Sequence, residues 1–262
     1  MKHLILLVAL LIPVAAHADD AAQRVLECLR ANVPTTVRVQ EFELRITDHL
    51  GESSTLSGRL FAQRESRGPQ PSFAHAMLRV NQPEHLRGAA YLVRQTDDYL
   101  RDGMYVYLPS VKRVRRVSGT FADGALLGTT FSYYDFKQLA NAFGDLDAHL
   151  EAPQTIEMRP VHVLSFKVLP GSETRYSGAR AWIDQATCLP LKVEFLEHGK
   201  PRKRLTANAN ALRPYGKFWY LSESELVDLR DNSRTLLRVT KVEGGEPLPK
   251  RLFDPNAFYL GG

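Results

Sequence analysis

The sequence lacks the short motifs that mark the common catalytic sites. It has no Gly-x-Ser-x-Gly nucleophile elbow, which argues against an α/β-hydrolase. It also has no phosphate-binding loop, no dinucleotide fingerprint and no His-Glu-x-x-His zinc motif. Its eight histidines are scattered and fit surface or polar-core positions better than catalytic ones. We therefore expect a protein without catalytic residues, a metal or a cofactor.

Long apolar runs are absent after the first 18 residues. Met1–Ala18 has the three parts of a secretory signal peptide: a charge at Lys2, an apolar core over residues 4–14, and the cleavage box Ala16-His17-Ala18. The apolar core is too short to span a bilayer, and no cysteine follows the box to carry a lipid anchor. The sequence predicts cleavage after Ala18 and a soluble periplasmic protein in which residues 19–262 form a single domain.

The net charge of the chain is small. The chain has 34 lysines and arginines against 29 aspartates and glutamates, a net charge of +5. This balance is too mild for a dedicated nucleic-acid-binding protein, and we expect no nucleic-acid partner. A weakly basic exported protein is compatible with transient contact at anionic membrane surfaces.

Cysteine is scarce, with only Cys28 and Cys188 present. In an oxidising compartment an even pair of cysteines favours a disulfide, which here would connect the first predicted helix to a late strand. The alternative is two buried free thiols. No histidine lies at ligand spacing from either cysteine, which argues against a metal site.

Short strands joined by turns account for most of the chain. A phase slip in the first strand predicts a β-bulge near Glu41. Strands at this spacing, with hairpin turn residues between them, predict a large antiparallel sheet. The expected strands are 37–46, 57–62, 74–80, 89–94, a run within 104–117, 161–168, 179–183, 191–196, 202–210, 218–227 and 235–242.

Only two segments have the residue spacing of an amphipathic helix. The first follows a cap at Asp19 and Asp20 and ends near Asn32, and the second begins at Ser132 and ends at Gly144. A long antiparallel sheet must cover its apolar face. We therefore predict a mainly β protein in which the two helices cover the concave face of a wide, curved sheet. The apolar space between them is a candidate ligand site, although the helical stripes also fit ordinary core packing.

The stretch from Met104 to Phe143 departs from the strand-and-turn pattern. A strand of alternating aromatic and aliphatic residues ends at Pro109, and the basic run Lys112, Arg113, Arg115 and Arg116 follows. One interpretation of this run is a solvated edge strand, because charged residues there prevent unwanted pairing. The other is a contact with an anionic partner or lipid headgroup.

The same stretch resembles the outer-membrane lipoprotein-sorting, LolA-like family, in the branch of exported proteins found with resistance-nodulation-division exporters. The resemblance rests on Val106-Tyr107-Leu108-Pro109, on the basic run, and on Gly128, Phe131, Ser132, Tyr133 and Asp135 at the helix start. Two threonines, at 129 and 130, replace the Ser-Asp of that branch, and Phe136 replaces its leucine.

The resemblance extends over nearly the whole mature chain, through Trp182-Ile183-Asp184, Leu189-Pro190-Leu191 and His198-Gly199-Lys200. It implies an unclosed β-barrel whose open side is filled by helices. It also implies that lipid or acyl chains are held in a hydrophobic cavity.

Two hypotheses about function follow. The first is a periplasmic carrier or chaperone that binds a lipid or a lipidated protein in a hydrophobic cavity for transfer between membranes. The second is an accessory protein that carries nothing and docks on an inner-membrane exporter through the basic strand. In the first, the basic run meets a headgroup or partner, and the expected cavity residues are Leu126, Leu127, Phe131, Phe136, Leu139 and Phe143.

Overall fold

A computed structural model describes residues 16–33, 38–67, 70–96, 102–143, 146–172, 174–244 and 249–260. Most of the expected signal peptide, and Gly144 at the expected helix end, lie outside these ranges. No helix among the described residues is long and apolar enough to cross a membrane. The α-helices are α1 (Ala16–Ala31) and α2 (Tyr133–Ala140). Short 3-10 turns are also present, and two of them, η5 (Lys250–Phe253) and η6 (Phe258–Leu260), follow the last strand.

The strands form one 14-stranded antiparallel sheet and a separate hairpin. The strands are β1 (Arg38–Thr47), β2 (Ser53–Arg67), β3 (Gln70–Gln82), β4 (Ala90–Arg94), β5 (Gly103–Leu108), β6 (Arg113–Arg116), β7 (Asp147–Leu150), β8 (Gln154–Ile156), β9 (Arg159–Lys167), β10 (Gly178–Asp184), β11 (Pro190–Glu197), β12 (Lys200–Thr206), β13 (Leu212–Tyr215), β14 (Phe218–Leu221), β15 (Glu223–Asp228) and β16 (Arg234–Gly244).

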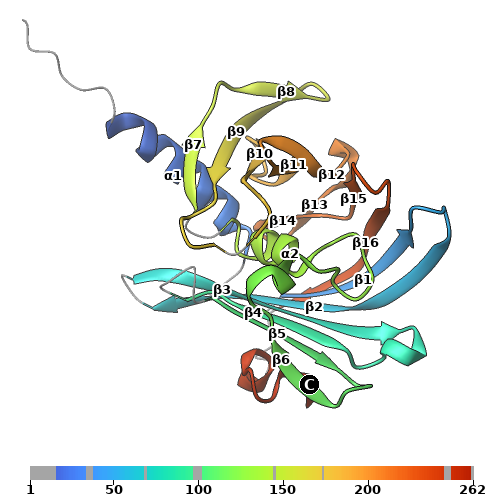
Figure 1. Cartoon of the computed structure of the whole chain (residues 1–262). Coiled ribbons are helices and arrows are strands. Elements are labelled where there is room, and N and C mark those ends of the chain that lie inside the picture. Colours follow the sequence, from blue (N-terminus) through green and yellow to red (C-terminus); the bar gives the residue numbers. More distant parts are fainter. Residues whose placement is uncertain are drawn as a thin grey trace, which may run out of the picture.

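The sheet bends around α2 without closing. Its strand order is β6-β5-β4-β3-β2-β1-β16-β15-β12-β11-β10-β9-β7, with β8 paired to β9. The β1–β16 pair joins an N-terminal half to a C-terminal half, and α2 lies between the two halves (Figure 1). Within the described chain β6 and β7 form the two ends of this path, so the predicted unclosed antiparallel sheet is confirmed.

The curvature of the sheet coincides with an irregularity at its centre. Glu41 of β1 lies opposite Lys241 of β16, but Phe42 lies opposite Val239, so Thr240 is an extra residue. Such an insertion bends a strand and increases its twist. The sequence located this bulge correctly near Glu41, but the extra residue is on the partner strand.

Both predicted helices are present with different ends. A capping box starts α2: the Asp135 amide donates to Ser132 Oγ at 3.0 Å, and the Ser132 amide donates to Asp135 Oδ2 at 2.8 Å. The helix ends at Ala140, and Phe143 follows in a left-handed conformation with φ of 65°. The expected cap of α1 at Asp19 and Asp20 is wrong, because the alanine-rich residues before it extend the helix to Ala16.

Three short strands, β7, β8 and β13, were not predicted, and one predicted strand is divided. The segment 218–227 forms β14 and β15, separated at Ser222, because β14 leaves the main sheet to pair with β13.

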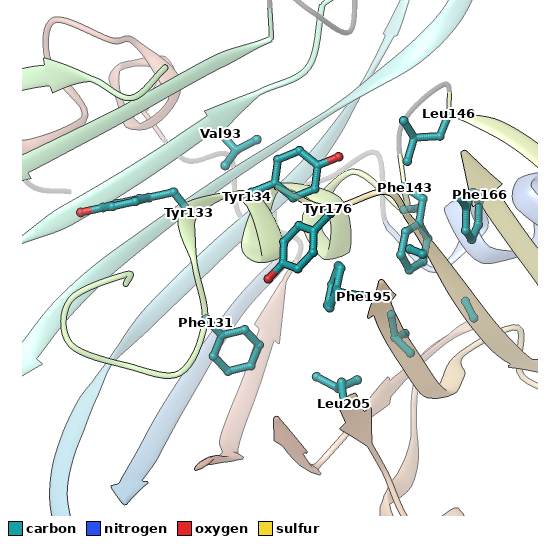
Figure 2. Close-up of a cluster of buried hydrophobic side chains, with 14 of the residues drawn as sticks. Val93, Phe131, Tyr133, Tyr134, Phe143, Leu146, Phe166, Tyr176, Phe195 and Leu205 are labelled. Atoms are coloured by element: carbon teal, nitrogen blue, oxygen red, sulfur yellow. The ribbon is translucent and has the colours of Figure 1, made fainter. Parts of the chain in front are cut away.

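Apolar side chains cover both faces of the sheet. On the concave side, residues of α1 and α2 pack with residues of β4, β5 and β9–β12 in one core cluster, part of which is shown in Figure 2. On the outer face, Leu252 and Phe258 from the C-terminal turns pack against Phe61, Met77 and Leu92. The C-terminal segment therefore lies across the outer face of the sheet.

The predicted disulfide between Cys28 and Cys188 is present, with the two Cα atoms 5.5 Å apart. It connects α1 to the turn before β11 across 160 residues of sequence. Asn32 strengthens the same junction, because its Nδ2 donates to the Thr187 carbonyl at 2.7 Å and its Oδ1 accepts from the Trp219 amide at 2.8 Å. The end of α1 is thus fixed to the C-terminal half of the sheet.

We expect the Cys28–Cys188 disulfide to contribute about 4 kcal/mol to the free energy of unfolding, because it closes a long loop in the unfolded chain. Urea unfolding with and without a reducing agent measures this contribution. The double variant Cys28→Ala, Cys188→Ala is the control, and its unfolding midpoint should not respond to reductant. A wild-type midpoint that is also unchanged by reductant would contradict the expectation.

Candidate ligand cavity

A cavity of about 270 Å³ lies between the concave face of the sheet and the segment from Leu126 to Phe143. Its lining is almost entirely apolar. The sheet contributes residues from neighbouring strands: Phe42 and Leu44 of β1, Leu56, Leu60 and Ala62 of β2, Ala76 and Leu78 of β3, and Leu237 and Val239 of β16.

Strand pairing explains why these side chains share one surface. Leu44 lies opposite both Leu56 and Leu237, and Leu60 lies opposite Leu78. Directly opposed residues in an antiparallel sheet place their side chains on the same face. The result is a continuous aliphatic floor across four adjacent strands.

All six residues predicted to line a cavity do line it: Leu126, Leu127, Phe131, Phe136, Leu139 and Phe143. That they bind a ligand stays a prediction. Three of them are also core residues: Leu126 and Phe131 are buried, and Phe143 stacks on Phe166 with ring centres 4.4 Å apart (Figure 2). The interpretation of this stripe as core packing is therefore partly right as well.

The segment over the cavity, residues 126–143, is fixed to the C-terminal half of the sheet by a buried ion pair. Lys203 of β12 places its Nζ 2.7 Å from Asp135 Oδ2 and donates to the Thr130 carbonyl at 2.7 Å. Asp135 is fully buried. Burial, with the nearby charge of Asp135, raises the pKa of Tyr176 far above its ordinary value. A hydrogen bond from the Thr130 amide to Thr235 Oγ1, at 2.9 Å, fixes the same loop to β16.

A second buried ion pair fixes the other side of α2. Lys137 Nζ lies 3.3 Å from Asp102 Oδ2, and Asn141 Nδ2 donates to the same oxygen at 3.3 Å. The other carboxylate oxygen accepts from the Thr96 amide at 2.7 Å. Burial lowers the pKa of Lys137, and the charge of Asp102 opposes that shift. Sequence reasoning missed Asp102, Lys137 and Lys203, because no local motif pairs residues so far apart.

The end of the cavity beside α1 is closed by Leu29, Val33, Leu189 and Pro190. The disulfide lies directly next to these residues in sequence, between positions 28 and 188. It therefore fixes two walls of the cavity to each other.

Two polar side chains of β1, Arg38 and Gln40, also line the cavity, as do Thr129, Tyr220 and Ser224. Arg38 Nη1 donates to the Asn32 carbonyl at 3.0 Å. Burial lowers the pKa of the Arg38 guanidinium to about 10, which still leaves it charged at neutral pH. Sequence reasoning missed both residues, although their alternation with Phe42 and Leu44 places all four on one face of β1.

The basic run lies away from the cavity. Arg113, Arg115 and Arg116 belong to β6 at the edge of the sheet, and Lys112 lies in the turn before it. All four are exposed, and none forms an ion pair with another described residue. The position of β6 agrees with the edge-strand interpretation. Among the ranges that the structure covers, no group of three or more His, Cys, Asp or Glu side chains could hold a metal ion.

Comparison with known proteins gives one family and a set of similar folds. A family model described as an uncharacterized protein matches residues 74–259. No curated protein matches the chain. A Vibrio parahaemolyticus domain named for outer membrane lipoprotein sorting is similar with a TM-score of 0.78 and 23% identity, over 94% of this chain and 99% of that one.

Two further structures share the fold. A DUF1329 family protein from Desulfovibrio piger has a TM-score of 0.80 and 19% identity, covering 92% of this chain and 98% of its own. A LolA superfamily protein from Nitrosomonas europaea has a TM-score of 0.66 and 19% identity, covering 88% and 96%. At these identities the likeness establishes a LolA-like fold.

We expect Asp135→Asn to lower the free energy of unfolding by about 3 kcal/mol, because it leaves the Lys203 ammonium buried without its counter-charge. Urea unfolding measures the loss. Adding Lys203→Met should recover part of it, since the unpaired charge is then removed.

A matched exposed pair serves as the control. Glu223→Gln breaks the ion pair with Arg238, in which both side chains are about half exposed, and should lower the free energy of unfolding far less than Asp135→Asn does. Equal losses from the buried and the exposed pair would contradict the proposed anchoring of the segment over the cavity.

Proposed function

We propose that this chain, which belongs to the protein family whose model matches residues 74–259, is a periplasmic carrier or chaperone that binds a lipid or the acyl chains of a lipidated protein. The cavity over the concave face is the observation that carries the proposal. Transfer between membranes needs no covalent chemistry, only a place where apolar chains are shielded from water.

The size of the cavity supports a ligand rather than a packing defect. Protein interiors contain few voids larger than a water molecule. An engineered apolar cavity of about 150 Å³ already binds benzene, and ligand pockets begin at about 300 Å³. At about 270 Å³ this cavity is near that lower limit, and each CH₂ removed from water into it is worth about 0.8 kcal/mol.

The anchoring of α2 explains why the sheet and the helix do not simply close on each other. Asp135 and Lys137 hold opposite sides of the helix through buried ion pairs with Lys203 and Asp102. Collapse of α2 onto the aliphatic floor would strain or break these pairs, which is costly for buried charges. The space is therefore maintained by the polar contacts around it.

We expect Leu139→Trp to weaken acyl-chain binding by at least about tenfold, because the larger ring occupies space inside the cavity. Displacement of a neutral fluorescent probe by monopalmitoylglycerol measures the affinity. Leu229→Trp makes the same change in an exposed turn and should leave binding unchanged.

Native mass spectrometry of gently purified wild-type protein should show co-purified acyl lipid. A cavity that is empty under every condition would remove the basis of the proposal.

A second candidate function is docking on a membrane exporter, and the exposed cations of β6 favour it. Three arginines on this edge strand and Lys112 in the turn before it, without ion pairs to described residues, form a surface suited to an anionic partner. The same surface would also suit anionic lipid headgroups. These two uses predict different partners for one strand.

Reversing the charge of Arg113, Arg115 and Arg116 to glutamate should abolish salt-dependent co-sedimentation with phosphatidylglycerol vesicles if β6 contacts headgroups. Retained vesicle binding, together with loss of a co-purifying exporter, would instead indicate docking. Acyl-chain affinity should be unchanged in either case, because β6 lies outside the cavity lining. The control reverses three exposed lysines elsewhere, Lys167, Lys200 and Lys217, for the same change in net charge.

A further inference from the structure

The part of the cavity lining that β1 contributes is polar at the start of the strand and apolar further along it. Arg38, Gln40, Phe42 and Leu44 alternate along this strand, so their side chains lie on its inner face, and all four line the cavity. From Arg38 to Leu44 the strand rises about 20 Å, at about 3.3 Å per residue. An elongated ligand lying along β1 would meet two polar side chains and then two apolar ones.

The two polar side chains have hydrogen-bonding capacity that the described residues do not use. Gln40 is 8% exposed, and its side-chain amide makes no hydrogen bond with them. Arg38 donates from Nη1 to the Asn32 carbonyl, but its buried Nε has no partner. No described carboxylate forms an ion pair with Arg38. A partly buried charge without a counter-charge is unfavourable, which makes this site suited to an anion.

We propose that the cavity takes an acyl chain that ends in an anionic oxygen group, a carboxylate or a phosphate, held by Arg38 and Gln40. The proposal rests on the carrier function above and names its ligand class. The planar guanidinium binds such groups through charge-assisted hydrogen bonds, and the Gln40 amide can donate one more. The chain then lies over Phe42 and Leu44. Arg38 is only partly buried, which keeps the headgroup close to solvent.

The test compares three ligands with the same 16-carbon chain: hexadecanoate, hexadecyl phosphate and hexadecan-1-ol. Each displaces a neutral fluorescent probe from the delipidated full chain, below the concentration at which the ligands form micelles. We expect at least one anion to bind about tenfold or more tightly than the alcohol, since hydrogen bonds to charged groups are stronger than neutral ones. The tighter of the two anions identifies the headgroup.

Substitutions at the headgroup site should remove this preference without removing chain binding. Arg38→Gln should bring the anions to about the affinity of the alcohol, whose own binding should change far less, and Gln40→Leu should reduce the preference in part. Arg45→Gln is the matched control, because Arg45 is exposed on the opposite face of the same strand. Thermal unfolding of each variant establishes that it is folded.

The possible failures are distinguishable. Equal binding of all three ligands by the wild type would overturn the headgroup assignment and leave the carrier function standing. Loss of all three ligands in a folded Arg38→Gln variant would overturn it too, because Arg38 would then shape the cavity rather than bind an anion. Failure of the wild type to bind any of the three would overturn the carrier function itself.

Discussion

The rest of the structure depends on one imbalance: the concave face of the sheet has more apolar surface than the segments lying over it can cover. The concave face of the sheet presents aliphatic side chains from four adjacent strands. Among the described residues, it is covered by α1, α2, the loop before α2, and a few side chains such as Leu189 and Leu221. Burial of apolar surface would draw these layers together. They remain apart because α2 is held at its two sides by the buried Asp135–Lys203 and Asp102–Lys137 pairs.

Buried ion pairs contribute little net stability, since the cost of removing charges from water offsets much of their attraction. Their value here is geometric. The two pairs fix α2 to different parts of the sheet. Asp135 of α2 binds Lys203 in β12, and Lys137 and Asn141 bind Asp102, the residue before β5. The disulfide acts similarly for α1, with covalent rather than ionic attachment. Together these contacts define a space that apolar packing alone would tend to fill.

The sequence was informative where a structural signal is local. The capping box at Ser132 and the cysteine pair each follow from residues read singly or a few at a time, and each is present. The bulge expected near Glu41 is present too, but its extra residue is Thr240 of β16. The six cavity-lining residues also came from one continuous segment, helped by a family resemblance. What the sequence could not provide was the pairing of Asp135 with Lys203, 68 residues apart, or the meeting of Arg38 with the cavity. Those contacts depend on strand order and register, which short alternating segments specify only weakly.

The central claim is that the interior of this sheet is kept open for an acyl chain. A crystal structure of the protein purified without detergent tests it most directly. The account predicts continuous, chain-like electron density over Phe42 and Leu44, between β1 and α2. An interior filled by the protein's own side chains, with α2 seated on the strands and no room for a chain, would contradict it.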